Sequence, residues 1–151
     1  RKGRDDKMEV HSRLRLQYTR RQGKSWQLQS TFNLHSLRSR GTGISLSQRL
    51  RYERKWAQTS ALLSYFRTPN YDTRIFQYEP VVSDQFHFPS LFGKGLRLVA
   101  TGKFALWKKR LMAEVLYGLT RFFDRNTQGN GMQQIRSPWK NDITLQIRLR
   151  I

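Results

Sequence analysis

The chain has 151 residues, which allows one domain, and its 37% hydrophobic and 13% aromatic residues lie above the composition of a disordered chain. It has no cysteine, which excludes a disulfide framework and a thiolate metal site. Lys and Arg number 29 against 10 Asp and Glu, a formal charge of +19 that would suggest a nucleic-acid partner if the basic residues were clustered.

The basic residues are not clustered in this way. Arginines recur at alternate positions, as at Arg13 and Arg15 or at Arg49 and Arg51, while apolar residues take the positions between them. Because successive side chains of a strand point to opposite faces, this alternation predicts strands with one basic, polar face and one apolar face.

Four such strands are predicted in the first half of the chain. They cover Met8 to Tyr18, Trp26 to His35, Ile44 to Glu53 and Ala57 to Tyr65. Turns are predicted at 21–24 and at 40–43, where glycines occur.

The second half repeats the pattern with longer connections. Strands are predicted at 73–79, 96–104, 111–119 and 141–151, separated by an irregular loop at 80–94, a turn at 106–109 and a long loop at 123–140. No segment has a helical period. The sequence therefore predicts an all-β, antiparallel meander of about eight long amphipathic strands.

Strand length and the position of the arginines favour a membrane over water. Eleven residues at about 3.3 Å each and a tilt near 40° rise about 28 Å, which covers the roughly 25 Å apolar band of an outer membrane. An Arg on the lipid face near the midplane would cost about 2–4 kcal/mol, and the mid-strand arginines lie almost entirely on the other face. The expected fold is a transmembrane β-barrel or its C-terminal part. The alternative is a soluble β-sandwich with the Leu face in its core and the Arg face in water.

The last predicted strand ends the sequence on an apolar residue. Its apolar positions are Ile143, Leu145, Ile147, Leu149 and Ile151. Bacterial outer-membrane barrels end in such a strand, which the barrel assembly machinery reads as a signal, although that signal normally finishes on Phe or Trp. The expected location is therefore the bacterial outer membrane. Because the sequence starts without Met or a leader, residues 1–151 are expected to be a segment of a longer barrel protein.

Residues 71–104 contain motifs that occur together in one known family. A YDTRIFQYE stretch precedes a Phe and Pro pair and then an FGKG stretch that leads into a strand. This combination resembles the C-terminal β-barrel region of Bacteroidota outer-membrane proteins of the helix-hairpin-helix-containing family. The matching residues are Tyr71, Asp72, Arg74, Ile75, Tyr78, Glu79, Phe86, Pro89, Phe92, Gly93, Lys94, Gly95 and Arg97. Further similarity lies at Asp124, Arg125, Gly129, Gly131, Ile135, Asp142, Leu145 and Gln146.

The resemblance implies an outer-membrane location and leaves the activity open. The helix-hairpin-helix region itself has no counterpart in these residues, so no DNA-binding residue can be carried over. Counting strands back from a periplasmic C-terminus places both long loops outside the cell and the turn at 106–109 in the periplasm. The same count places the turns at Gln22 and Lys55 outside.

No catalytic, cofactor-binding or metal-binding residue is predicted. His11 and His35 share the polar face near Ser25 and Ser45, but no acid is placed to orient either imidazole, so a structural role is expected for both. His87 lies in the loop at 80–94. The glycine pairs 41/43, 93/95 and 129/131 lack the spacing of a phosphate-binding loop and are interpreted as turn residues.

The expected function is a membrane scaffold or a porin-like channel with a basic lumen that prefers anions. The basic lumen residues are Arg13, Arg15, Arg49, Arg51, Arg97, Lys103, Arg148 and Arg150. Either water and counter-ions or an acidic segment from outside these residues is expected to neutralise them. Glu9 and Glu53 are expected to pair with arginines across strands.

The expected partners are outer-membrane lipid, lipopolysaccharide and the barrel assembly machinery. The sequence identifies no small-molecule substrate. The alternative function is a soluble basic β domain that binds nucleic acid through Arg and aromatic side chains on one sheet face. Most aromatic residues lie opposite the arginines, which disfavours this alternative.

Overall fold

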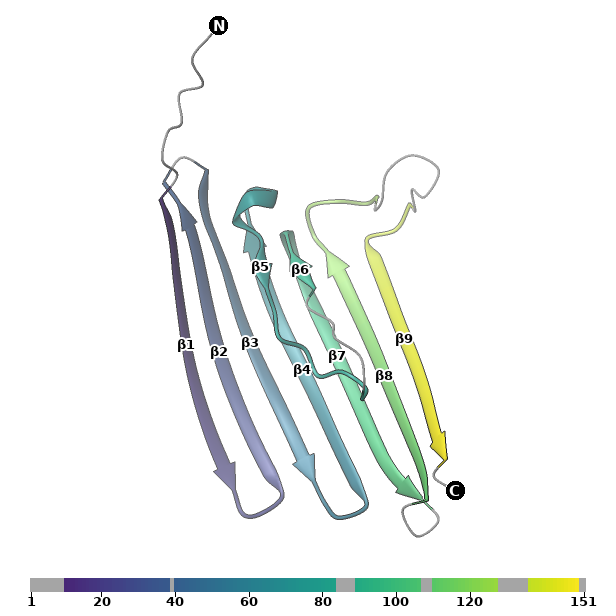
Figure 1. The fold of residues 1–151 in the computed structure, drawn as a ribbon. Helices are drawn as coiled ribbons and strands as arrows, with labels where there is room; N and C mark the ends of the chain where they lie inside the picture. Colours follow the sequence, from purple (N-terminus) through teal and green to yellow (C-terminus); the bar gives the residue numbers. More distant parts are fainter. Residues whose placement is uncertain (1–9, 39, 84–88, 107–109, 128–135, 150–151) are drawn as a thin grey trace, which may run out of the picture.

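The computed structural model describes residues 10–38, 40–83, 89–106, 110–127 and 136–149. Seven long strands form one antiparallel sheet in the order β1-β2-β3-β4-β7-β8-β9 (Figure 1). This confirms the predicted all-β antiparallel meander. The strands are β1 (His11–Gln22), β2 (Trp26–Leu37), β3 (Gly41–Glu53), β4 (Ala57–Thr68), β7 (Gly93–Leu106), β8 (Leu111–Phe122) and β9 (Trp139–Leu149).

The edges of this sheet are β1 and β9. In the order given above, each of these two strands has one neighbour, and within the described ranges they are not paired with each other. The described strands therefore make an open, curved sheet rather than a closed barrel (Figure 1).

The register aligns residues of like polarity across the sheet. Thr31 of β2 lies opposite Ser47 of β3, and Arg97 of β7 lies opposite both Ser64 of β4 and Thr120 of β8. The apolar rows are aligned in the same way. The sheet therefore has one face of Leu, Ile, Val and aromatic side chains, which we call the apolar face, and a polar face that carries Arg, Ser, Thr and acidic side chains.

Burial is reversed relative to a soluble sheet. On the apolar face Leu46 is 55% exposed and Leu145 is 68% exposed, whereas on the polar face Ser64 is 1% exposed and Arg97 is 3% exposed. A soluble sandwich would need a second layer over the Leu face, and the described residues provide none. The described strands therefore form one layer of large sheet, not the two packed layers of the sandwich alternative.

The connection between β4 and β7 covers the centre of the polar face. This connection contains the 3-10 helix η1 (Tyr71–Thr73) and a small two-stranded sheet of β5 (Ile75–Phe76) and β6 (Ser90–Leu91). Residues 74–83, which we call the strap, run from η1 along the polar face (Figure 1). Val82 of the strap packs in a small buried cluster whose other members are Leu62, Val99 and Leu116 of the sheet.

The prediction of a long strand at 73–79 is wrong. Only Ile75 and Phe76 pair with another strand, and the backbone then crosses the polar face of the large sheet. The alternating pattern was a correct sign of extended backbone, since Gln77 and Glu79 are buried while Tyr78 is exposed. It could not reveal that these side chains pack onto a sheet face instead of belonging to a spanning strand.

Because residues 73–79 do not form a strand of the large sheet, that sheet has one strand fewer than predicted. This changes which turns lie at the same end of the sheet. The turns β1–β2 and β3–β4 lie at the end where β9 finishes, and the connections β4–β7 and β8–β9 lie at the opposite end (Figure 1). The prediction that the turns at Gln22 and Lys55 lie with the long loops is therefore wrong. Both long connections share an end, as expected.

Only some of the paired glycines are turn residues. Gly41 and Gly93 have positive φ values of 97° and 86°. Gly43 lies within β3, where a Cβ atom would meet the Thr73 carbonyl oxygen, so it allows η1 to pack closely on the sheet. The interpretation of Gly43 as a turn residue is wrong, and Gly95 within β7 likewise makes room for Phe66. The pair 129/131 lies outside the described residues.

Candidate functional site: the polar face under the strap

A buried ion pair holds the centre of the strap. Arg97 donates from Nε to Oε1 of Glu79 at 2.5 Å and from Nη2 to Oε2 at 2.7 Å, which is a bidentate pair. Nη1 of the same guanidinium donates to Thr120 Oγ1 at 2.7 Å and to Asp142 Oδ2 at 3.1 Å. The Arg97 and Glu79 side chains are 4% and 1% exposed. One guanidinium thus joins the strap to β7, β8 and β9.

Gly118 of β8 leaves the space that this guanidinium occupies. A Cβ at Gly118 would lie 3.4 Å from Arg97 Nη2 and 3.3 Å from Asp142 Cβ. A methyl group therefore almost fits there, while a longer side chain would displace the guanidinium.

We expect Gly118→Leu to lower the free energy of unfolding by about 1–3 kcal/mol or more through overpacking, and Gly118→Ala to lower it by less than about 1 kcal/mol. Urea titration followed by tryptophan fluorescence measures both. Equal tolerance of Ala and Leu would contradict this account of the network.

A second anchor lies at the end of the strap. The backbone N–H of Ser83 donates to Glu114 Oε2 at 2.6 Å, and Lys103 Nζ donates to Ser83 Oγ at 3.2 Å. Lys103 and Glu114 also form an ion pair at 3.4 Å, with the carboxylate side chain 2% exposed. This anchor connects the strap to β7 and β8.

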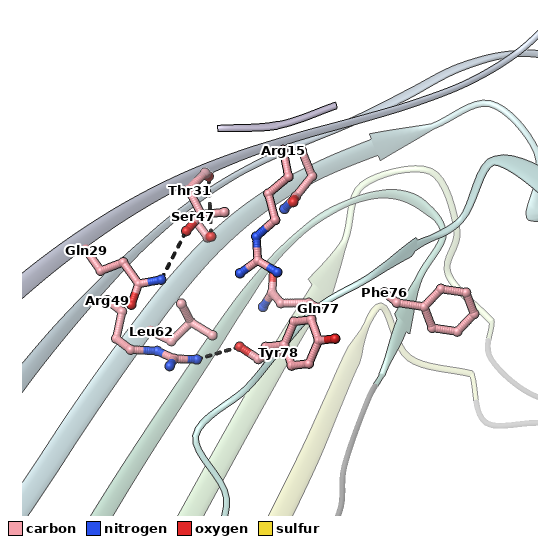
Figure 2. A pocket seen from close by; sticks show the side chains of 10 residues that line it. Arg15, Gln29, Thr31, Ser47, Arg49, Leu62, Phe76, Gln77 and Tyr78 are labelled. Carbon is pink, nitrogen blue, oxygen red and sulfur yellow. Dashed lines mark hydrogen bonds between the residues drawn. The ribbon is translucent and has the colours of Figure 1, made fainter. Parts of the chain in front are cut away.

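A third set of contacts lies at the start of the strap. His35 Nδ1 donates to the Arg74 carbonyl oxygen at 3.2 Å, since a carbonyl oxygen can only accept. Arg49 Nη2 donates to the Tyr78 carbonyl oxygen at 2.5 Å, and the Arg15 guanidinium lies 5.1 Å from the centre of the Tyr78 ring. Figure 2 shows both arginine side chains reaching from the sheet toward the strap.

The predicted basic residues therefore separate into groups. Arg97 and Lys103 are in buried or half-buried ion pairs with acids of this chain. Arg51 pairs with Glu53 at 3.2 Å along its own strand, rather than across strands as expected. Arg13 and Arg148 lie on the polar face of β1 and β9, while Arg150 and Glu9 lie outside the described residues.

The source of the neutralising acids differs from the expectation. Glu79, Glu114 and Asp142, all within this chain, neutralise part of the positive charge of the polar face through ion pairs with Arg97 and Lys103. Glu114 was not predicted as a partner, although its polar-face position in the predicted strand at 111–119 could have identified it. Glu79 was missed because its segment was read as an ordinary strand.

The apolar residues of the final strand lie together on one exposed face, as their alternation predicts. Ile143 is 72% exposed, Leu145 68%, Ile147 66% and Leu149 55%, all on the apolar face of β9. Ile151 lies outside the described residues.

The two histidines that the structure describes contact each other and the strap. The rings of His11 and His35 stack with their centres 5.8 Å apart, and His35 binds the strap backbone through Nδ1. In the described ranges, no three His, Asp or Glu side chains come together as metal ligands. His87 is not described.

Two adjoining pockets lie between the first three strands and the strap. They share Arg15, Asn33, Phe76 and Tyr78, and their cavity volumes are about 30 and 270 Å³. Figure 2 shows the side chains that line the smaller pocket. We call the combined space the strap groove.

Comparisons with protein-family models, curated proteins and solved structures find no match for this chain. Among the residues that the structure describes, no helix has the length and hydropathy required to cross a membrane.

Proposed function

We propose that the chain is a segment of a bacterial outer-membrane β-barrel, acting as a membrane scaffold or a channel. The observation that carries the proposal is the reversed burial: large apolar side chains are exposed along all seven long strands, while the centre of the polar face is covered by the strap. In water such a surface is an unusually large apolar patch, whereas in a membrane it is the surface that lipid covers. The resemblance to the Bacteroidota family supports the same location.

In this proposal the polar face lines the lumen and the strap fills part of it. Arg97 and Lys103 are paired with buried acids and Arg51 with the exposed Glu53, so the basic character of the lumen comes mainly from Arg13, Arg15 and Arg49 on β1 and β3. A lumen with this lining would favour anions if it conducts. Lipopolysaccharide phosphates and the assembly machinery remain proposed partners.

The open edges of the sheet also fit a larger barrel. In a bilayer the backbone groups of an edge strand must find hydrogen-bond partners, because lipid offers none. The edges β1 and β9 would therefore pair with each other or with further strands in the assembled protein.

Cysteine labelling tests both the location and the orientation. The chain has no native cysteine, so Thr127→Cys in the β8–β9 connection and Lys24→Cys in the β1–β2 turn give single thiols at opposite ends of the sheet. With long loops outside, a membrane-impermeant thiol reagent on intact cells should label Thr127→Cys and spare Lys24→Cys until the outer membrane is permeabilised. Labelling of Lys24→Cys alone would invert the orientation, and recovery of the protein in the soluble fraction would reject the location.

A soluble nucleic-acid-binding domain remains the alternative. The strap places Tyr78 beside Arg15, which is the Arg and aromatic combination used to stack bases. The strap also covers the centre of the polar face, where Arg97 is 3% exposed. A single-stranded nucleic acid could therefore not contact the basic residues continuously across the sheet. Salt-sensitive binding of a single-stranded oligonucleotide by soluble protein would favour this alternative.

A further inference from the structure

We propose that the strap groove binds a small hydroxylated organic anion, of the class of a sugar phosphate. The charge of the groove is the first observation. Four arginines line it, Arg13, Arg15, Arg49 and Arg74, and among the described residues no carboxylate does. The nearest acid of the strap, Glu79, is bound on both oxygens by Arg97. The groove therefore attracts an anion.

Unpartnered buried atoms are the second observation. In the described part of the chain, five buried side-chain polar atoms have no hydrogen-bond partner, and three of them belong to groove residues: His35 Nε2, Arg49 Nε and Gln77 Oε1. His35 and Gln77 are themselves only 7% and 4% exposed. Buried polar groups are normally satisfied, so this concentration indicates a place where a bound molecule completes the contacts.

The chemistry of these three atoms specifies more than an anion. Arg49 Nε is a hydrogen-bond donor, as is every N–H group of a guanidinium. Such donors bind the oxygens of a phosphate or carboxylate. Gln77 Oε1 accepts, and His35 Nε2 also accepts in the neutral ring because Nδ1 holds the proton donated to the Arg74 carbonyl oxygen. Two acceptors beside an anion site need donors on the same ligand, and hydroxyl groups supply them without adding a positive charge beside the arginines.

The walls of the groove fit the carbon skeleton of such a ligand. Phe76 and Tyr78 of the strap line the groove and are 50% and 58% exposed overall. The Tyr78 ring lies beside Arg15, where it can contact a sugar ring, whereas the Phe76 ring points away from the other lining side chains (Figure 2). Amide and hydroxyl side chains of Gln29, Thr31 and Asn33 lie on the sheet side. The groove lies on the polar face, opposite the apolar side chains, which favours a free molecule over a lipid head group.

The proposal is tested by calorimetric titration of the purified protein in nonionic detergent with glucose 6-phosphate. Glucose, which has only the hydroxyl groups, and inorganic phosphate, which has only the anion, are titrated for comparison. We expect saturable binding of one glucose 6-phosphate per chain, and binding of glucose or phosphate weaker by about tenfold or more because each makes half of the contacts. No binding of glucose 6-phosphate, or equally tight binding of phosphate alone, would overturn the proposal.

A matched pair of arginine variants separates a built site from general attraction by positive charge. Arg15→Gln removes a groove guanidinium that donates to Gln17 and lies over the Tyr78 ring. Arg51→Gln removes a guanidinium from the same face outside the groove. We expect about tenfold weaker binding of glucose 6-phosphate in Arg15→Gln and less than about a twofold change in Arg51→Gln. Equal losses would reject the site. Ligand binding is measured whether or not the protein inserts into vesicles. A failure of the binding proposal is therefore distinct from a failure of the membrane proposal.

Discussion

Replacing Glu79 by Gln is expected to lower the free energy of unfolding by about 3–5 kcal/mol, because it leaves the buried Arg97 guanidinium without its bidentate partner. Gln keeps the size and shape of the side chain, so the loss would come from the charge. Urea titration of the folded protein, followed by the fluorescence of its 4 tryptophans, measures the change.

Two further variants make this expectation specific. Glu53→Gln removes an exposed carboxylate that pairs with Arg51 at 3.2 Å, and it should cost at most about 1 kcal/mol. Replacing both partners, as Glu79→Leu with Arg97→Met, should cost less than the sum of the two single changes because neither charge is left alone. Additive losses in this cycle, or a Glu79→Gln loss no larger than that of Glu53→Gln, would show that the strap is not held by the pair.

Leu145→Arg is expected to lower the stability of the vesicle-inserted protein by about 2–4 kcal/mol. Leu145 lies near the middle of β9 on the apolar face and is 68% exposed, so the folded chain itself loses few contacts. The cost would arise from placing a charge in lipid. Refolding titrations into phospholipid vesicles measure it.

The neighbouring position provides the control for this experiment. Gln146→Arg introduces the same side chain one residue further on, on the polar face of the same strand. It should change stability by less than half as much as Leu145→Arg. If the chain is soluble instead, Leu145→Arg at an exposed site should stay within about 0.5 kcal/mol of the parent. Equal effects of the two variants would remove the distinction between the faces.

The sequence predicts the strands well because their alternation is local. A residue's face depends only on its parity along the strand, and the register then follows from short turns such as the one at Gly23, which has a positive φ of 63°. The exposure of Ile143, Leu145 and Ile147 on one face could thus be expected before the fold was known.

The strap could not be predicted in the same way, because its position depends on distant residues. Glu79 is placed by Arg97, and Arg97 in turn needs the space above Gly118 and the carboxylate of Asp142, 45 positions further on. Nothing in residues 74–83 alone distinguishes an extended segment that joins a sheet from one that lies across it. The strap groove was missed for the same reason, since it exists only once the strap has docked.

The buried Arg97 network also has a consequence for the order in which the sheet is completed. The guanidinium receives one carboxylate from 18 positions earlier in the chain and another from 45 positions later. The Glu79 carboxylate balances its charge, but the hydrogen bond from the guanidinium to Asp142 forms only when β9 has joined β8, so docking of the strap and addition of the last strand stabilise each other. The final step of folding would therefore be cooperative: a chain whose last strand is unpaired would also hold its strap less firmly, and its interior would be more open to water and to proteases.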